Sequence, residues 1–364
     1  MKKSRQISDQ RTMLKQEAIA LIEETLSAKI LHTAGSVLLK LTGQTNAHPA
    51  PWYVGTIVLT LVALLPQILI AWIWKQPQQV IGSGLMWSLA VLLAVQAIPL
   101  THLVARYNTT FICDHIIDNI EAEKNIEDLR AFVIEYLGDR QWMLSYALFA
   151  SVIWSIIAIS VFSVFNHGFI GLVHSIDLWI FGFCAPGLGL YFVHVLIQLP
   201  NRLGNYRYQV YELNPAQSEV INDIATLFTR PFWAIAIFLS ICTVVASLFG
   251  DLLWVLALVI LFWIPMIVEF INGQNAINKI ISAAKWQALN RVQEKIRKHQ
   301  ESADFDAPGN IESLNKLMDL YERVYSTSSF KLTIKSTLEF LNQMLLPLLA
   351  FLVSNFDKVT KLFK

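Results

Sequence analysis

The chain has 364 residues, of which 55% are hydrophobic and only 15% are charged, and its mean hydropathy is positive. This composition is too apolar for an ordinary soluble globular protein of this length, so it predicts an all-α integral membrane protein. The formal net charge of +1 is uninformative as a total, because acidic and basic residues segregate along the chain.

Three cysteines, Cys113, Cys184 and Cys242, are widely spaced and odd in number. They therefore support neither a disulfide framework nor a zinc site. The basic N-terminus lacks the apolar run that follows the first residues of a cleavable signal peptide, so we expect it to belong to the mature protein.

Residues 1–51 are expected to form a cytosolic or interfacial arm. Ala18, Ile22 and Leu26 recur at helical spacing, and an apolar face continues over residues 30–41. Such a helix either lies among the lipid headgroups or packs against the protein's own cytosolic face, and the sequence leaves both alternatives open.

Apolar stretches of about 20 residues, the length that crosses the hydrocarbon core, follow the arm. The six stretches cover residues 52–74, 81–105, 142–165, 172–197, 232–249 and 252–271. Short links within each successive pair predict six transmembrane helices arranged as three antiparallel hairpins. The hairpins occupy 52–105, 142–198 and 232–271, and cytosolic loops occupy 106–141 and 199–231. Asn214 and Pro215 predict the start of a short helix in the second loop.

Basic residues set the expected orientation. With a cytosolic N-terminus, Lys75 is the only one of the 28 Lys and Arg residues on the opposite side. Cytoplasmic loops of membrane proteins carry an excess of Lys and Arg. We therefore expect both termini in the cytoplasm, with the protein in the plasma (inner) membrane of a bacterium.

Two cytosolic connections carry opposite charge. Residues 106–140 contain four basic and eight acidic side chains, a net of −4, whereas residues 272–300 contain six basic and one acidic, a net of +5. Either the two segments pair within the molecule, or each is a solvated helix face.

A basic helix is expected over residues 275–299. Its charges could contact anionic lipid headgroups, and its apolar positions allow pairing within the protein, with another copy of the chain or with a partner protein. The basic positions concerned are Lys279, Lys285, Arg291, Lys295 and Lys298.

The last hundred residues continue this cytosolic extension to residue 330 and end in an ambiguous segment, 331–364. Residues 338–353 are nearly apolar but number only about 16 and include Glu339 and Pro347. We expect an amphipathic interfacial or re-entrant helix here, and a seventh span is the alternative.

Ionisable residues inside membrane helices are costly and therefore mark candidate sites. Glu269 lies one turn after Pro265, which frees the backbone carbonyl of Leu261 for a cation or proton. His102 and His194 lie at the corresponding ends of the second and fourth expected spans. These three side chains could line an ion or proton path, or they could simply reach the headgroup boundary at the helix ends.

His174 and Asp177 are one turn apart at the outer start of the fourth expected span and could form a polar pair. A metal site would need more ligands, so none is expected. Residues 200–208 interleave aromatic residues with only two arginines, which is typical of a juxtamembrane belt rather than of nucleic-acid binding.

No sequence motif indicates an enzyme or a cofactor. Two function classes remain. The first is a membrane scaffold or regulatory subunit, whose helical cytosolic surface binds partner proteins or another copy of the chain. The second is an ion or proton channel or transporter that uses the proline-containing second, fourth and sixth spans.

Overall fold

The computed structural model describes residues 2–43, 49–73, 83–138, 140–162, 187, 189–211, 213–249, 252–302, 308–327 and 334–356. Helices account for nearly all of these residues, and no strand occurs among them. Their one β-type feature is an isolated antiparallel bridge between Ile120 and Tyr208. The expected all-α class is therefore confirmed for the described part of the chain.

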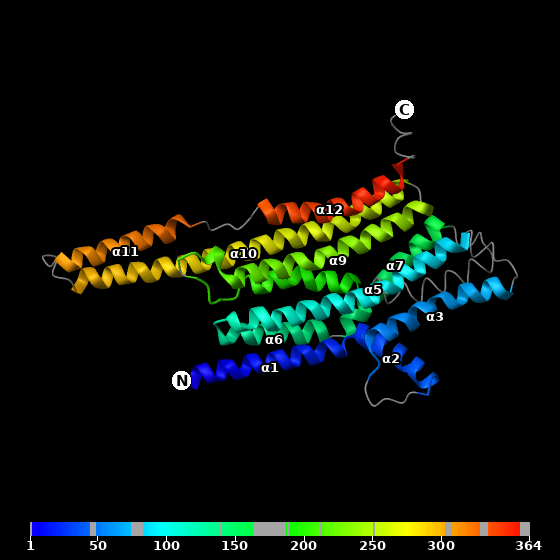
Figure 1. Cartoon of the computed structure of the whole chain (residues 1–364), viewed down its shortest axis with the longest axis horizontal. Coiled ribbons are helices and arrows are strands. Elements are labelled where there is room, and N and C mark those ends of the chain that lie inside the picture. Colours follow the sequence, from blue (N-terminus) through cyan, green and yellow to red (C-terminus); the bar gives the residue numbers. More distant parts are fainter. Residues whose placement is uncertain are drawn as a thin grey trace.

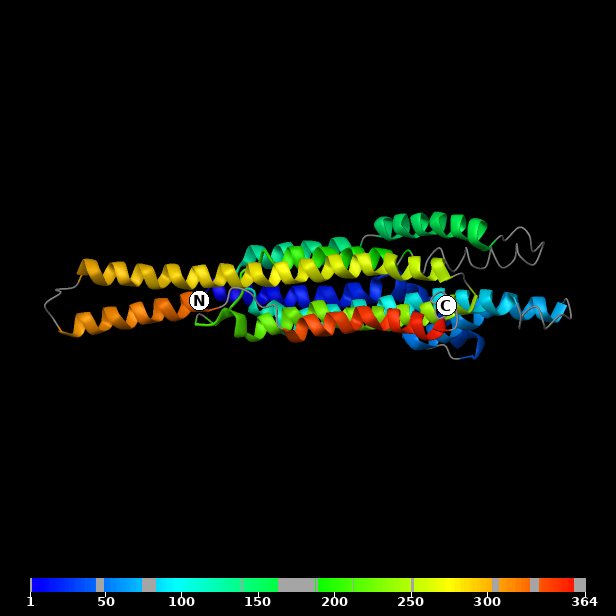
Figure 2. The ribbon, with the colours of Figure 1, turned by 90° about the horizontal axis from the view of Figure 1, so that it is seen from above.

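Most helices run along one long axis and form an elongated bundle (Figures 1 and 2). In chain order they are α1 (Lys2–Glu24), α2 (Leu26–Leu41), α3 (Trp52–Ile73), α5 (Ser83–Phe111), α6 (Glu123–Gly138), α7 (Arg140–Phe162), α9 (Glu219–Phe249), α10 (Leu252–Ser302), α11 (Pro308–Ser326) and α12 (Ile334–Ser354). Another helix covers residues 189–203. Short helical turns are the π-helix η1 (Ile112–Ile116) and the 3-10 helices η2 (Ile117–Asn119) and η4 (Pro215–Gln217).

Two long helices, α9 and α10, each join an expected span to an expected cytosolic segment without a break. α9 begins at Glu219 and continues through Pro231 into the span expected at 232–249. α10 has 51 residues and continues through Pro265 into the basic segment. A proline inside a helix removes one backbone hydrogen bond, but tertiary packing can keep the helix continuous. Because α9 packs against α10, the two helices form a common frame.

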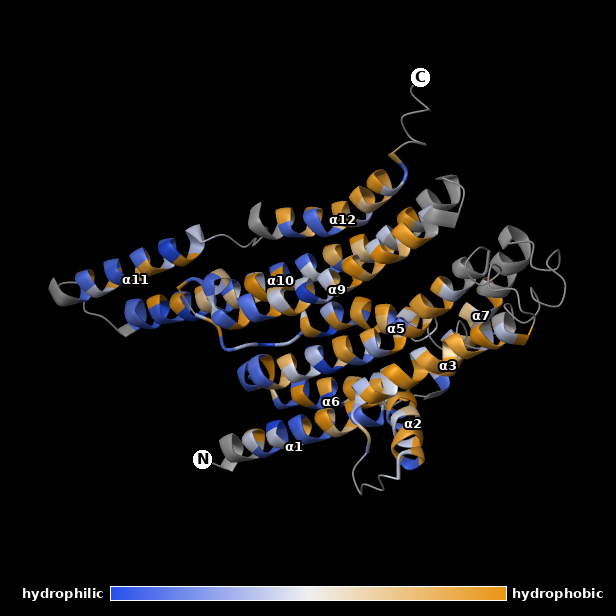
Figure 3. Ribbon diagram, turned by 45° about the vertical axis from the view of Figure 1, so that its right-hand side comes forward, coloured by the Kyte–Doolittle hydropathy of each residue, from blue (hydrophilic) through white to orange (hydrophobic). Residues whose placement is uncertain are grey.

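Apolar and polar residues are concentrated at different ends of this frame (Figure 3). The apolar half comprises α3, α7, α12, residues 232–249 of α9 and residues 252–271 of α10. The polar half comprises α1, α6, α11, residues 219–231 of α9 and residues 272–302 of α10.

One stretch of the described chain, Glu219–Val245, is long and apolar enough to cross a membrane. Shorter apolar helical stretches are Trp52–Pro66, Gln141–Ile153 and Leu338–Ser354. Much of the expected fourth span, 172–197, lies outside the described residues. Within the described chain, one helical stretch therefore combines the length and the apolar composition that crossing a membrane requires.

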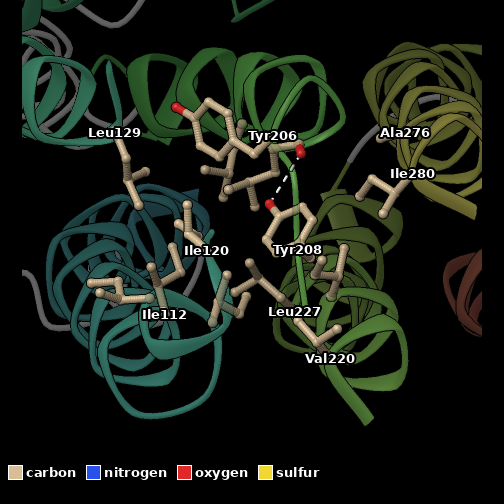
Figure 4. Close-up of a cluster of buried hydrophobic side chains, with 14 of the residues drawn as sticks. Ile112, Ile120, Leu129, Tyr206, Tyr208, Val220, Leu227, Ala276 and Ile280 are labelled. Atoms are coloured by element: carbon tan, nitrogen blue, oxygen red, sulfur yellow. Dashed lines mark hydrogen bonds between the residues drawn. The ribbon is translucent and has the colours of Figure 1, made fainter. Parts of the chain in front are cut away.

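A large buried cluster lies where α1, η1, α6, the helix over 189–203, α9 and α10 meet (Figure 4). Leu203, Ile221 and Ile224 are almost fully buried in it. Tyr208 belongs to the same cluster and donates its hydroxyl hydrogen to the carbonyl of Leu203 at 3.0 Å. Burying one aliphatic side chain of this size contributes about 1.5–3 kcal/mol, so this cluster stabilises the polar half.

The N-terminal arm packs on the protein's own helices through α1, which is one of the two alternatives that the sequence leaves open. Leu14 and Ala18 are buried in the large cluster. Glu17 accepts two hydrogen bonds from the guanidinium of Arg130, and Lys15 pairs with Asp118 at 2.7 Å. The acidic segment 106–140 is thus tied to α1 by two ion pairs of opposite direction, one with the basic residue on α1 and one with the acidic residue on α1.

Asp128 anchors the same acidic segment to the chain that follows residue 200. Its carboxylate accepts hydrogen bonds from Arg202 at 3.1 Å and from the Tyr206 hydroxyl at 2.7 Å. Burial, reinforced by the negative charge of Asp128, raises the pKa of Tyr206 above its ordinary value. Tyr206 therefore remains a hydrogen-bond donor throughout the physiological pH range.

The C-terminal helix α12 lies along α9 and runs in the same direction. The side-chain amide of Gln343 donates to the carbonyl of Thr229 at 3.3 Å, and the amide of Asn355 donates to the hydroxyl of Ser247 at 2.8 Å. Residues 343–355 of α12 therefore accompany residues 229–247 of α9.

Candidate functional site

The residues singled out from the sequence lie in three regions of the described structure. The basic residues lie on the second part of α10. Glu269 lies between α9, α10 and α12. His102 and His194 border a cluster formed by α2, α3, α5, α7 and the helix over 189–203.

Residues 275–302 of α10 and the antiparallel helix α11 form a projection that we call the α10–α11 arm. It extends beyond α1 and α6 at the polar end of the bundle (Figure 1). Its buried cluster is small and consists of Ala288, Leu289 and Val324, with Leu320 and Tyr321 packed against it. Most of the arm surface is therefore exposed.

Several basic residues of the arm have defined structural partners. The ammonium group of Lys285 donates to the carbonyls of Tyr325 and Thr327, each at 2.7 Å, and so holds the end of α11. Lys279 donates to the side-chain oxygen of Asn205. Lys298 pairs with Glu294 at 2.8 Å. The basic positions are therefore not one uniform surface patch.

Further along the arm, Arg291 and Lys295 are exposed. The indole of Trp286 is also exposed, with 58% of its surface accessible. Tryptophan and arginine are enriched in protein–protein interfaces, so Trp286 and Arg291 are candidate contact residues of the arm.

Glu269 points into the helix bundle. It is 2% exposed, although it carries an ionisable side chain. Met266, one turn earlier, belongs to a buried cluster with Phe232 and Phe340, and Gly273, one turn later, lies against Phe228. Protein side chains rather than a helix end therefore surround Glu269.

No hydrogen bond or ion pair within the described chain reaches the Glu269 carboxyl group. An ionised carboxylate without a partner in such surroundings costs several kcal/mol or more. Two helical turns before Glu269, the carbonyl of Leu261 has no helical donor, because Pro265 has no N–H.

Sequence reasoning missed the contribution of α12 to this site. Gln343 is 1% exposed, and its side-chain oxygen has no hydrogen-bond partner in the described chain, although its amide nitrogen reaches Thr229. The signal was present as a helical stripe of buried positions, Phe340, Gln343, Pro347 and Phe351.

His102 is completely buried, and neither of its ring nitrogens has a hydrogen-bond partner in the described chain. Its ring lies 6.3 Å from that of Trp52. Nearby, His32 contacts the carboxylate of Glu23 at 2.9 Å and the carbonyl of Ala50 at 2.5 Å. The structure thus buries His102 and leaves both ring nitrogens without a hydrogen bond in the described chain.

His194 is half-buried, and its ring centroid lies 6.2 Å from that of Tyr136 and 5.7 Å from that of Tyr146. Tyr136 and Tyr146 pack against the same cluster as Trp52, the ring neighbour of His102. The structure therefore brings both histidines to the border of one cluster, whereas Glu269 borders another cluster formed by α9, α10 and α12.

The expected polar pair His174 and Asp177 lies outside the described residues. Among the residues that are described, no group of three or more His, Cys, Asp or Glu side chains is arranged to hold a metal ion. Cys113 is buried in the polar half, and burial raises the pKa of its thiol to about 11. Such a thiol is a poor nucleophile at neutral pH.

Comparison with protein-family models, with curated proteins and with solved structures finds no match to this chain.

Replacement of His102 by leucine tests whether the unpartnered ring lowers the stability of the fold. The His102→Leu variant should be more stable by about 1–3 kcal/mol, because two buried polar atoms without hydrogen bonds are removed. The measurement is the Tm in detergent. Tyr206→Phe serves as the control and should lower the Tm, because it removes the bond to Asp128. A loss of stability in His102→Leu would reveal a polar partner for that ring.

Proposed function

We propose that this protein is a polytopic helical membrane protein that acts as a scaffold or regulatory subunit. Its apolar half anchors it in the bilayer, and its α10–α11 arm presents a helical surface to partner proteins in the cytoplasm. The observation that carries this proposal is the continuity of α10, which links the apolar half to the arm in one helix of 51 residues.

Exposed apolar stripes support a bilayer as the surroundings of the apolar half. Contiguous apolar surfaces of this kind are rarely exposed to water. The exposed residues are Ile57, Leu61, Leu65, Ile68 and Trp72 on α3, Leu144, Leu148, Phe149 and Val152 on α7, Ile237, Ile241 and Val244 on α9, and Leu338, Leu341, Leu345, Leu349 and Val353 on α12. We accordingly propose membrane spans in the three hairpins expected from the sequence.

The packing of α12 favours a seventh span over an interfacial helix. α12 accompanies the membrane-length part of α9, buries one face against it and exposes leucines on the opposite face. A helix lying along the membrane surface would instead cross α9 at a steep angle. With a cytoplasmic N-terminus, this arrangement puts the C-terminus on the outer side, in place of the cytoplasmic C-terminus expected from the sequence.

The basic residues of the arm lie at different distances from the expected end of the membrane span, because α10 is long. At 1.5 Å per residue, Lys279 lies about 12 Å beyond Ile271, the expected end of the span, whereas Lys298 lies about 40 Å beyond it. Electrostatic attraction to headgroups falls off over about 8–10 Å at physiological ionic strength. Lys279 is therefore the basic residue of the arm that lies nearest to the lipid headgroups, and the outer part of the arm is suited to a protein partner.

A second candidate function is ion or proton transport. The buried and unpartnered side chains of Glu269 and His102 favour it, because such groups inside membrane helices are typical of ion paths. The separation of Glu269 from His102 and His194 into different clusters makes a single path through all three less well supported than the scaffold.

Liposome flux measurements distinguish the two functions. Under the scaffold proposal, the purified protein should cause no proton or ion leak above that of empty liposomes. A flux that is lost in Glu269→Gln but retained in Glu294→Gln, a change at an exposed arm residue, would replace the scaffold by transport.

Cysteine labelling tests the topology. Single cysteines at Gly168, Lys124 and Phe356 are introduced after Cys113, Cys184 and Cys242 are replaced by serine, and intact cells are treated with a membrane-impermeant maleimide. Gly168→Cys and Phe356→Cys should react from outside, whereas Lys124→Cys should react only after permeabilisation. If Phe356→Cys behaves like Lys124→Cys, α12 does not cross the membrane. Equal reaction at Gly168→Cys and Lys124→Cys would contradict the membrane span expected between them.

Photo-crosslinking tests the role of the arm. A benzophenone amino acid at position 286 should give an adduct with a protein in native membranes, whereas the same residue at position 142 should give lipid adducts only. Trp286 and Trp142 are equally exposed, at 58%, so accessibility is matched. Lipid adducts at both positions would contradict the proposal.

A further inference from the structure

Glu269 and Gln343 lie on facing helices that are in contact at this level. The rings of Phe270 and Phe340 stack with centroids 4.0 Å apart and planes within 12° of parallel. Glu269 directly precedes Phe270 on α10, and Gln343 lies one helical turn beyond Phe340 on α12. Both side chains are at least 98% buried, so the pair is enclosed by protein.

Each of these two side chains lacks an interaction partner that the other could supply. The Glu269 carboxyl lacks a partner for its negative charge, and the side-chain oxygen of Gln343 lacks a hydrogen-bond donor. The Gln343 amide nitrogen already donates to the carbonyl of Thr229, so the side-chain oxygen is the atom that can still accept a hydrogen bond. A protonated carboxyl group has one O–H donor and could therefore satisfy both requirements.

Among the side chains that the structure describes, no charged group of the packed helices neutralises Glu269. At this level of the bundle, α9 carries Arg230, which is exposed and donates to the hydroxyl of Tyr107. α12 carries Glu339, which would add negative charge rather than cancel it. Neither residue forms an ion pair with Glu269 in the described chain. A metal ion would require several more oxygen ligands than Glu269 and Gln343 provide.

We propose that Glu269 and Gln343 form a proton-binding site enclosed by α9, α10 and α12, in which the protonated carboxyl of Glu269 donates to the side-chain oxygen of Gln343. The ligand is a single proton, bound and released at one carboxyl oxygen. The inference rests on the proposed location of this part of α10 in the membrane, but it does not require transport. Gln343 is a positioning residue that orients the carboxyl group.

Infrared spectroscopy of the full chain in liposomes tests the site directly. A protonated carboxyl gives a C=O stretching band distinct from that of a carboxylate, and this band should be lost in Glu269→Gln. Because donation of a hydrogen bond lowers the frequency, Gln343→Leu should shift the band upward, to that of a carboxyl without an acceptor. The matched control is Asn342→Leu, a change at an exposed neighbour on α12, which should leave the band in place. Absence of a band that depends on Glu269 would overturn the site, and an unchanged band in Gln343→Leu would overturn the role of Gln343.

Chemical labelling provides a second measurement in the same sample. Dicyclohexylcarbodiimide, an apolar reagent, adds to protonated carboxyl groups in apolar surroundings, so peptide mass spectrometry should find its adduct at Glu269 and not at the exposed Glu294. Lack of an adduct at Glu269 would contradict the proposal. Cysteine labelling measures the topology separately. If the topology is as expected but Glu269 gives no adduct, the proton site is wrong and the membrane scaffold is unaffected. If Glu269 gives an adduct but the topology differs, the carboxyl binds a proton in surroundings other than the proposed membrane span.

Discussion

The contact between α9 and α10 is the interaction on which the rest of the structure depends. Each helix continues past an internal proline from one half of the molecule into the other, so their packing holds both halves in one frame. α1 and η1 join the polar part of this frame, α12 lies along the apolar part of α9, and α11 lies along the outer part of α10. A displacement of α10 relative to α9 would therefore affect every region discussed above.

Polar side chains within the apolar half fall into two physical classes. The first class links helices, as Asn355 does to Ser247, and such interhelical bonds stabilise helix pairs where water is scarce. The second class is buried without a hydrogen-bond partner in the described chain; Glu269 belongs to it, and His102 on α5 resembles it. Residues of the first class explain the position of α12. Residues of the second class reduce stability, and that cost points to a function.

The sequence predicted the helical class, the apolar face of the N-terminal arm and the continuation of the last expected span into a basic helix. These features are local, because they follow from composition and from spacing along one helix. The same reasoning could not choose between self-packing and lipid contact for α1. That choice depends on Asp118 and Arg130, which are over a hundred residues away from their partners Lys15 and Glu17.

The direction in which the Glu269 side chain points also could not be predicted from the sequence. A glutamate near the end of an apolar helix can extend outward to the headgroups or inward to a neighbouring helix, and spacing alone favours neither. The inward direction follows from Gly273, which lets α10 approach Phe228, and from Phe340, which stacks on Phe270. Phe340 lies on α12, so α12 completes the enclosure of the Glu269 carboxyl group. The position of α12 was the least certain from the sequence. Any mechanism that moves α12 away from α9 would therefore expose Glu269, and the protonation of that carboxyl and the docking of the C-terminal helix are physically linked.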